Sequence, residues 1–234
     1  MRFCACLLLL GLGVEACSYL PQPEALPAGS IVSEDRTTIV ITTSRSASAT
    51  TGLLFYPGAL VDPHAYVGLM QRLADAGQGQ RVFIAKVPAN LAVIQPQAAE
   101  AIIYNYPDVK NWVIAGHSLG GAMACRWVRL RPESVRGLVL LAAYPAATDN
   151  LSDWSGGVLS LYGTLDGVLD QSALTDGLAR LPARTVVVPL TGGNHAQFGN
   201  YGAQNGDGQA TISREEQQAQ TTLQFTQFMK SLGL

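Results

Sequence analysis

Seven short apolar runs recur after the first 36 residues, and helix-like segments separate them. Most of the runs are continuously apolar, which is typical of strands buried on both faces of a parallel sheet. Alternation of strands and helices predicts a mainly parallel, doubly wound α/β sheet with helices on both faces. The predicted strands are Thr37–Thr42, Gly52–Tyr56, Arg81–Val87, Trp112–Ala115, Gly137–Ala142, Val158–Tyr162 and Thr185–Pro189.

The segments between the strands carry helix start and stop signals. Asp62 followed by Pro63 is a helix start, with the aspartate as N-cap. Ser213 and Glu216 have the spacing of a capping box at the start of the last helix. The predicted helices cover about 62–76, 97–104, 119–129, 172–180 and 213 to near the C-terminus.

Composition limits the classes of partner. The 234 residues are enough for one domain with a sizeable core. The formal net charge is -2, and the chain has no basic block. Nucleic acid is therefore not an expected partner, nor is a membrane attracted by a polybasic patch. We divide the chain into an export signal (1–17), a linker (18–36) and a folded domain (37–234).

The N-terminus has the pattern of an export signal. Arg2 precedes an apolar stretch from Phe3 to Val14, which is too short to span a bilayer. The run from Val14 to Cys17 resembles a bacterial lipobox, although Glu15 is unusual within it. Three alternatives stay open: lipidation of Cys17, a conventionally cleaved signal, and an uncleaved anchor. The expected location is the cell envelope, where the protein is either anchored in the membrane or free.

The cysteines predict neither a disulfide framework nor a zinc site. Cys4 and Cys6 lie within the predicted signal, which leaves Cys17 and Cys125. Cys125 lies in a helix-like run and is interpreted as a small buried residue.

The sequence Gly116-His117-Ser118-Leu119-Gly120 fits the pattern G-x-S-x-G between a buried strand and a helix. A serine on such a sharp turn projects its hydroxyl above the sheet, and the glycines avoid steric clashes. The helix that follows directs its free N–H groups toward the serine. The motif predicts that Ser118 is a nucleophile; the alternative is a tight turn with an idle serine.

Three histidines compete for the role of general base. His195 lies in a Gly-rich loop directly after the last predicted strand, where parallel α/β sheets present their functional residues. His117 is part of the turn itself and is expected to point away from the serine. His64 is expected to make surface or capping contacts. His195 is therefore the predicted base.

An acid is expected between the serine and the histidine in chain order. Asp166 follows a strand and a short turn, at the same sheet edge. Asp170 is the competitor, and its alternative role is a helix N-cap. Asp149 and Asp153 are interpreted as solvated loop residues. The predicted acid is Asp166.

Two backbone N–H groups are expected to form an oxyanion hole. Leu119 follows the nucleophile, and the loop after Gly52–Tyr56 supplies the second donor. Pro57 has no N–H, so Ala59 is the predicted donor, with Leu60 as the alternative.

Four segments together resemble the α/β-hydrolase superfamily. The chain is most similar to its small lidless branch, α/β-hydrolase family 5, which is related to dienelactone-hydrolase-like esterases. The resemblance implies the fold, the triad Ser118, Asp166 and His195, and no cofactor. Dienelactone hydrolases proper have a cysteine nucleophile, so the serine here argues against that substrate. The segments are FYPGALVDPHAYVGLMQRLADAG, GHSLGG, YGTLDG and GGNHAQFGNYG.

The expected function is hydrolysis of a carboxylic ester of a small molecule through an acyl-enzyme. A peptidase, lactonase or acyltransferase with the same triad is an alternative, as is a non-catalytic envelope protein with this fold. Only about 144–156 is available for a lid, so an open site is expected. The oligomeric state is left open.

Two further predictions concern the surroundings of the site. Tyr144, Trp154 and Phe198 are candidates to line an acyl pocket, with ordinary packing as the alternative. The loop Phe198–Thr211 contains Asn and Asp residues but lacks the spacing of a calcium-binding EF-hand loop. It is interpreted as a solvated rim.

Overall fold

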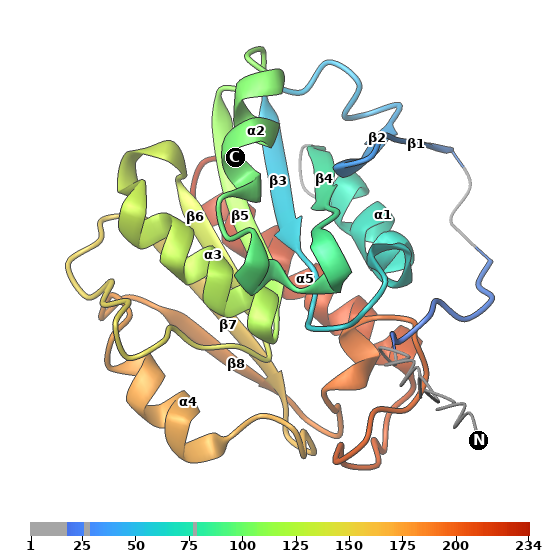
Figure 1. Cartoon of the computed structure of the whole chain (residues 1–234), viewed down its shortest axis with the longest axis vertical. Coiled ribbons are helices and arrows are strands. Elements are labelled where there is room, and N and C mark those ends of the chain that lie inside the picture. Colours follow the sequence, from blue (N-terminus) through green and yellow to red (C-terminus); the bar gives the residue numbers. More distant parts are fainter. Residues whose placement is uncertain (1–17, 26–28, 77–78) are drawn as a thin grey trace, which may run out of the picture.

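The computed structural model describes residues 18–25, 29–76 and 79–234. Its strands form one sheet in the order β1-β2-β4-β3-β5-β6-β7-β8 (Figure 1). β2 is antiparallel to β1 and β4, and all pairings from β4 to β8 are parallel. The predicted fold class is therefore confirmed. The strands are β1 (Ser30–Glu34), β2 (Thr38–Thr43), β3 (Thr51–Tyr56), β4 (Arg81–Ala85), β5 (Asn111–His117), β6 (Gly137–Leu141), β7 (Gly157–Gly163) and β8 (Val186–Leu190).

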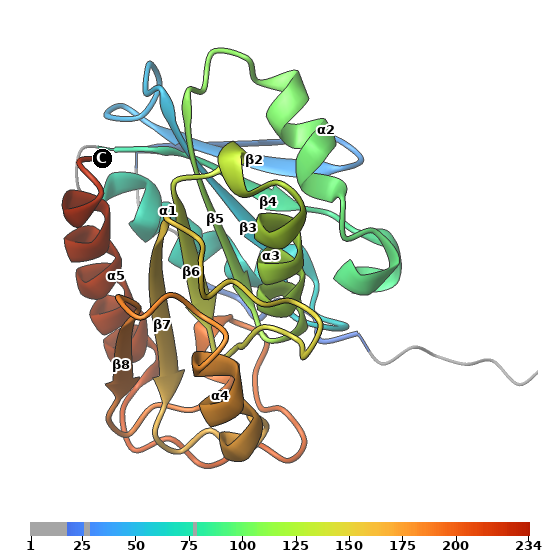
Figure 2. The ribbon, with the colours of Figure 1, turned by 90° about the vertical axis from the view of Figure 1, so that its left-hand side faces the viewer.

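Helices cover both faces of this sheet (Figure 2). α1 (Val67–Asp75) and α5 (Arg214–Ser231) pack on one face, and α2 (Ala98–Asn105) and α3 (Leu119–Leu130) pack on the other. α4 (Gln171–Leu178) lies beside the last two strands on the side of α3. Within the described ranges, no helix combines the length and apolar character needed to cross a bilayer.

Local capping explains where two of these helices begin. The Ser213 hydroxyl accepts a hydrogen bond from Glu216 N, and the Glu216 carboxylate accepts one from Ser213 N, as the capping box predicts. Asp62 caps the next segment through its bond from His64 N. That segment opens as a 3₁₀ helix, Pro63–Tyr66, before it continues as α1.

The prediction of a linker at 18–36 is wrong for the residues that the structure describes. β1 pairs with β2 along its full length, and 18–25 contacts the folded body. Proline-rich composition excludes a helix in this segment, but it does not exclude an extended chain whose backbone bonds to neighbouring loops. The predicted export signal, 1–17, lies outside the described residues.

β8 is less buried than its apolar sequence predicts. It is the last strand of the sheet, so only β7 pairs with it. Val186 and Val187 are exposed, and Pro189 is tolerated because one side of an edge strand needs no donor. The sequence pattern could not distinguish this edge strand from a central one.

The connection between β6 and β7, residues 142–156, determines access to the carboxyl edge of the sheet. It consists of turns and irregular chain without a helix. No lid covers the edge from this connection, as predicted from its length.

Candidate active site

Ser118 occupies a strained turn between β5 and α3. Its backbone angles are φ 52° and ψ −125°, a region that residues other than glycine rarely adopt. Ser118 N donates to Leu141 O at 2.9 Å, and Ser118 O accepts from Gly121 N and Ala122 N. The serine is therefore fixed by backbone bonds between a neighbouring strand and the first turn of a helix.

Glycines make this turn sterically feasible. A Cβ at Gly116 would lie 2.4 Å from the carbonyl carbon of Gly120, and one at Gly121 would lie 2.3 Å from Ala143 Cβ. A Cβ at Gly120 would lie 2.3 Å from the carbonyl oxygens of Tyr56 and Pro57. The motif thus allows α3 to approach both its own strand and the loop after β3.

His195 and Asp166 form a buried pair at the same edge of the sheet. His195 Nδ1 lies 2.8 Å from Asp166 Oδ2, with side-chain exposures of 2% and 0%. The other carboxylate oxygen accepts from Val168 N and Leu169 N at 2.9 and 2.8 Å. Both oxygens are therefore engaged, and a carboxylate held this way favours the imidazole tautomer with its proton on Nδ1. His195 Nε2 is buried and has no hydrogen-bond partner among the described residues.

Ser118 and His195 face the same cavity, which has a volume of about 350 Å³. Of the three aromatic candidates, Tyr144 lines this cavity, whereas Trp154 and Phe198 do not. The Trp154 indole N–H donates to Pro132 O, and Phe198 is fully buried in the core. The lining is mostly apolar and consists of Ser118, Leu119, Ala122, Ala142, Ala143, Tyr144, Ala146, Val168, Leu169, Asp170 and His195.

The loop after β3 offers few free N–H groups. Gly58 N donates to Tyr66 Oη at 3.1 Å, and Leu60 N donates to Asn90 O at 2.8 Å. Pro57 has no N–H. Of positions 57 to 60, Ala59 alone has an N–H without a bond to any described residue. The structure therefore disfavours Leu60, the alternative oxyanion donor.

The competing aspartates have other environments. Asp170 caps α4 by accepting from Ser172 N and Ala173 N, the alternative role expected for it. Asp153 is exposed, as predicted. Asp149 is not a solvated loop residue, because it is only 1% exposed. Its Oδ1 lies 3.9 Å from Arg126 Nη1 and 3.8 Å from Arg129 Nε, and both arginines belong to α3.

The other two histidines differ sharply from each other. His64 is partly exposed and contacts Asp62 and Glu34, as expected for a surface residue. His117 is buried, and its ring centroid lies 4.5 Å from that of His195. Burial, followed by the proximity of His195, holds the pKa of His117 well below its usual 6.5. His117 is therefore neutral and packs against the candidate base.

Tyr66 connects His117 to the loop after β3. Its fully buried hydroxyl accepts from Gly58 N and lies 2.8 Å from His117 Nδ1. Burial also raises the pKa of the Tyr66 hydroxyl, so it stays protonated and donates to His117. Sequence reasoning missed this connection, because Tyr66 and His117 are 51 positions apart.

Asp207 fixes the loop that carries His195. Its carboxylate accepts from the backbone N–H groups of Gly167, His195, Ala196 and Gly208. The prediction of a solvated rim at Phe198–Thr211 is therefore wrong for 198–201 and for the Asp207 carboxylate, whereas the rest of 202–211 is exposed or partly exposed. Asn200 and Tyr201 are also buried within it. Polar composition gave no sign that a carboxylate would be satisfied by backbone donors.

α5 supports the same loop from below. Gln217 is fully buried; its Oε1 accepts from Asn194 N, and its Nε2 donates to Asn194 O, both at 2.9 Å. The Gln217 side chain therefore binds both the backbone N–H and the backbone carbonyl of Asn194, the residue directly before the candidate base.

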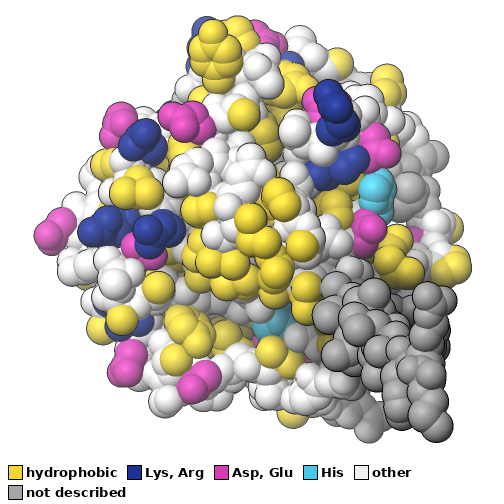
Figure 3. All heavy atoms as spheres, in the orientation of Figure 1, with side chains coloured by type: hydrophobic (Ala, Val, Ile, Leu, Met, Phe, Trp, Pro, Cys, Tyr) yellow, Lys and Arg dark blue, Asp and Glu magenta, His cyan; other side chains and the backbone are white. Residues whose placement is uncertain are grey.

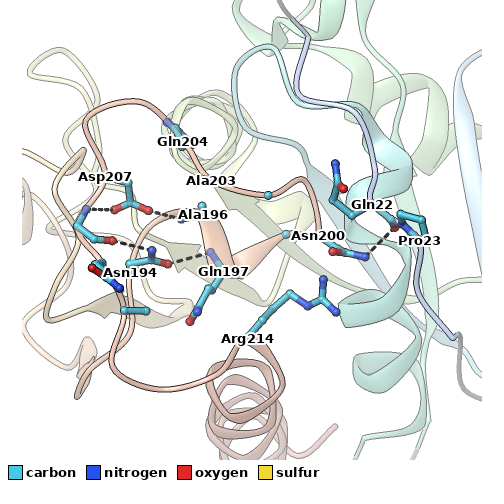
Figure 4. Close-up of a pocket in the computed structure, with 15 residues that line it drawn as sticks. Gln22, Pro23, Asn194, Ala196, Gln197, Asn200, Ala203, Gln204, Asp207 and Arg214 are labelled. Atoms are coloured by element: carbon cyan, nitrogen blue, oxygen red, sulfur yellow. Dashed lines mark hydrogen bonds between the residues drawn. The ribbon is translucent and has the colours of Figure 1, made fainter.

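A larger cavity of about 590 Å³ lies between this loop, Gln22 and Pro23 (Figure 4). Amide side chains of Asn194, Gln197 and Asn200 line it together with Arg214 from α5. Ser118 is not part of its lining. This cavity is separate from the one that the serine and histidine share.

Comparison with known families identifies the chain. The sequence profile of the alpha/beta hydrolase family, in its family 5 form, matches residues 52–219. The chain belongs to the alpha/beta hydrolase family. The match includes Ser118, Asp166 and His195, and it agrees with the resemblance inferred from the sequence motifs. No curated protein sequence matches the chain.

Solved alpha/beta hydrolase structures share the fold at low sequence identity. One, named MGS-MChE2, comes from a metagenome of lagoon sediments from Mar Chica, Morocco; it has a TM-score of 0.63 and 13% identity, covering 87% of this chain and 100% of that one. A monoacylglycerol lipase from Paleococcus ferrophilus gives 0.58 and 14%, covering 76% and 94%. Est1E from Butyrivibrio proteoclasticus, with ferulic acid bound, gives 0.60 and 11%, covering 83% and 94%.

Proposed function

We propose that this alpha/beta hydrolase is a serine carboxylic ester hydrolase with Ser118 as nucleophile, His195 as general base and Asp166 as its acidic partner. One observation carries the proposal: a serine in a strained turn shares a cavity with a histidine whose other nitrogen is bonded to a buried carboxylate. These residues follow β5, β7 and β8 at one edge of the sheet, in the chain order expected of this fold.

The reaction proceeds through an acyl-enzyme. His195 Nε2 takes the proton of Ser118 Oγ as that oxygen attacks the ester carbonyl. The tetrahedral intermediate collapses, the bond to the alkoxy group breaks, and the imidazolium gives its proton to the departing alcohol. Water then attacks the acyl group by the same route, which releases the acid and restores the serine.

Asp166 and the backbone supply the electrostatic support. Asp166 keeps the Nδ1 tautomer and stabilises the imidazolium that forms during each step. The N–H groups of Leu119 and Ala59 stabilise the oxyanion. Loss of one such donor costs on the order of 100- to 1,000-fold in rate.

The lining of the cavity favours a substrate whose acyl group is apolar or aromatic. Alanine, leucine and valine side chains predominate in its lining, and Tyr144 adds an aromatic surface. The name of the Paleococcus ferrophilus monoacylglycerol lipase implies that this relative acts on esters. Est1E is described with ferulic acid, an aromatic acid, bound. We therefore place the substrate of this chain among carboxylic esters of small molecules, with no cofactor required.

A fluorophosphonate probe tests the nucleophile. The probe reacts with activated serines, so the native chain should be labelled and Ser118→Ala should not be. Ser160, which lies buried in β7, provides a control, and Ser160→Ala should be labelled like the native chain. Equal labelling of the native chain and Ser118→Ala, or no labelling of either, would contradict the proposal.

A substrate series separates the ester reaction from its rivals. Hydrolysis rates for p-nitrophenyl esters of increasing acyl length should exceed those for matched anilides and lactones. A higher kcat/KM for an anilide or a lactone would instead indicate a peptidase or lactonase. Transfer to an added alcohol in preference to water would indicate an acyltransferase.

The proposed location is the cell envelope, with Cys17 as the lipid attachment site. The support is the order of Arg2, the apolar stretch and the lipobox-like run before Cys17. Mass spectrometry of the mature N-terminus tests it: a diacylglycerol-modified Cys17 is expected, and an unmodified residue after a cleavage at another site would contradict it.

A further inference from the structure

The segment that follows Cys17 is bound to the edge of the candidate active site. Tyr19 forms a parallel bridge with Val61, in which Tyr19 N donates to Leu60 O at 2.8 Å and Asp62 N donates to Tyr19 O at 2.9 Å. The Tyr19 ring also contacts Tyr201, with ring centroids 5.4 Å apart. These contacts fall directly after Ala59, the proposed oxyanion donor.

The same segment makes a second set of contacts near the His195 loop. Gln22 N donates to Asn200 O at 2.8 Å, and the Asn200 amide donates back to Gln22 O at 2.9 Å. The Glu24 carboxylate lies 3.7 Å from Arg214 and accepts from the Asn200 amide at 3.2 Å. Backbone and side-chain bonds therefore fix 18–25 along two loops of the site.

This attachment limits how far Cys17 can lie from the site. Cys17 is two positions before Tyr19, and an extended chain of that length spans at most about 7 Å. A lipid on Cys17 would therefore hold the site-bearing edge of the sheet close to the membrane surface.

Exposed apolar side chains belong to segments next to the site: Leu20 follows Tyr19, and Val168 lines the cavity. Val93 and Ile94 belong to a short 3₁₀ helix, Ala92–Ile94, that packs against α3. Their exposed fractions are 53% and 56%, and those of Leu20 and Val168 are 61% and 37%. Figure 3 shows apolar side chains gathered in the middle of this face, with most charged ones toward its margin. We name Leu20, Val93, Ile94 and Val168 the apolar rim.

We propose that the apolar rim rests on the lipid surface to which Cys17 is attached, and that the substrate is an acyl ester entering the cavity from that surface. The proposal rests on the proposed function and on lipid attachment at Cys17. Val168 belongs both to the rim and to the cavity lining, so one member of the rim adjoins the cavity that Ser118 also lines. An acyl chain moving along this route stays in contact with apolar groups.

Quenching by brominated lipid tests the contact independently of activity. The full chain is reconstituted into phosphatidylethanolamine–phosphatidylglycerol vesicles, with or without bromine on the acyl chains. Fluorescence from Val93→Trp should fall at least twofold more than that of the native chain. Leu223→Trp is the control, because Leu223 is exposed on α5, across the sheet from α3 (Figure 2). Equal quenching of both variants, or of neither, would overturn the proposal.

Activity on two kinds of ester tests the route of entry. Val93→Glu combined with Ile94→Glu should reduce hydrolysis of a vesicle-embedded long-chain ester at least tenfold. Hydrolysis of soluble p-nitrophenyl acetate should stay within twofold, because neither residue lines the cavity. Leu223→Glu should alter neither rate. An unchanged rate on the embedded ester, or equal losses on both esters, would overturn the proposal.

The two assays separate this inference from the proposed function. A native chain that neither reacts with fluorophosphonate nor hydrolyses the soluble ester would refute the hydrolase, and the quenching result would still decide whether the rim contacts lipid. A chain that is active on the soluble ester but shows no quenching at Val93→Trp would refute the rim alone.

Discussion

The two sides of the candidate active site are held in place by different means. On the nucleophile side, Ser118 is positioned by backbone bonds and by glycines within 116–121. On the base side, His195 is positioned by carboxylate and amide side chains from distant parts of the chain. Those side chains belong to Asp166, Asp207 and Gln217.

This difference indicates what each side tolerates. The nucleophile side depends on the absence of side chains, so added atoms would disturb it. The base side depends on polar atoms that satisfy buried donors, so removed atoms would disturb it. Removal of a polar group should therefore cost more activity on the base side than on the nucleophile side.

The largest effect is expected for Asp166→Asn. An amide in place of the carboxylate no longer favours the Nδ1–H tautomer and cannot stabilise the imidazolium. In the serine-protease triad the equivalent change lowers kcat about 10⁴-fold, and we expect a loss of that order here. Steady-state ester hydrolysis checks kcat, and circular dichroism checks that the fold is kept. A loss below tenfold would show that the base does not depend on this carboxylate.

Asp207→Ala should reduce stability as well as activity. It removes the acceptor for four backbone N–H groups, and each buried donor left unpaired costs about 1–3 kcal/mol. Water can reach some of them, so we expect the free energy of unfolding to fall by about 3 kcal/mol. Because the loop then holds His195 less firmly, kcat should fall about 100-fold.

The control for that prediction is Asp153→Ala. Asp153 is exposed, and its removal should change neither unfolding in urea nor kcat. If Asp207→Ala behaved like Asp153→Ala, the base side would not depend on long-range side-chain bonds, and the comparison between the two sides would fail.

The same division explains what the sequence could predict. Ser118 was identified because a strained turn needs a local pattern of glycines, and His195 and Asp166 because they follow strands in order. The role of Asp207 was missed, since its partners at Gly167 and His195 are distant in sequence. The contacts of 18–25 with the folded domain were missed for a similar reason. The hydrogen bond from Tyr19 N to Leu60 O depends on tertiary structure, not on composition.

Tyr66→Phe removes a side-chain hydrogen bond on the nucleophile side. Without its hydroxyl, Gly58 N loses its acceptor, and the adjacent Ala59 N–H is less well oriented toward an oxyanion. We expect kcat to fall about tenfold while KM changes little, since the oxyanion forms only in the transition state.

Tyr56→Phe is the matched control for that variant. The Tyr56 hydroxyl is also buried, but it bonds to Pro96 O and Ala99 N on the other face of the sheet. Both variants should lose about 1 kcal/mol of stability, the typical contribution of one hydrogen bond. Only Tyr66→Phe should lower kcat, and equal kcat values would assign Tyr66 a structural role alone.

The last effect is confined to acidic pH, where the stability of the fold depends on His117, which contacts both Tyr66 and His195. Because burial lowers its pKa in the folded chain, the unfolded chain binds a proton that the folded chain does not once the pH falls below about 6.5. The free energy of unfolding should therefore decrease by up to about 1.4 kcal/mol per pH unit from pH 6.5 toward 5, with no contribution from His117 above that range. Urea unfolding of the native chain and of His117→Gln measures the two slopes. The free energy of unfolding of His117→Gln should depend less steeply on pH than that of the native chain. Identical slopes would show that His117 is not kept neutral in the folded chain.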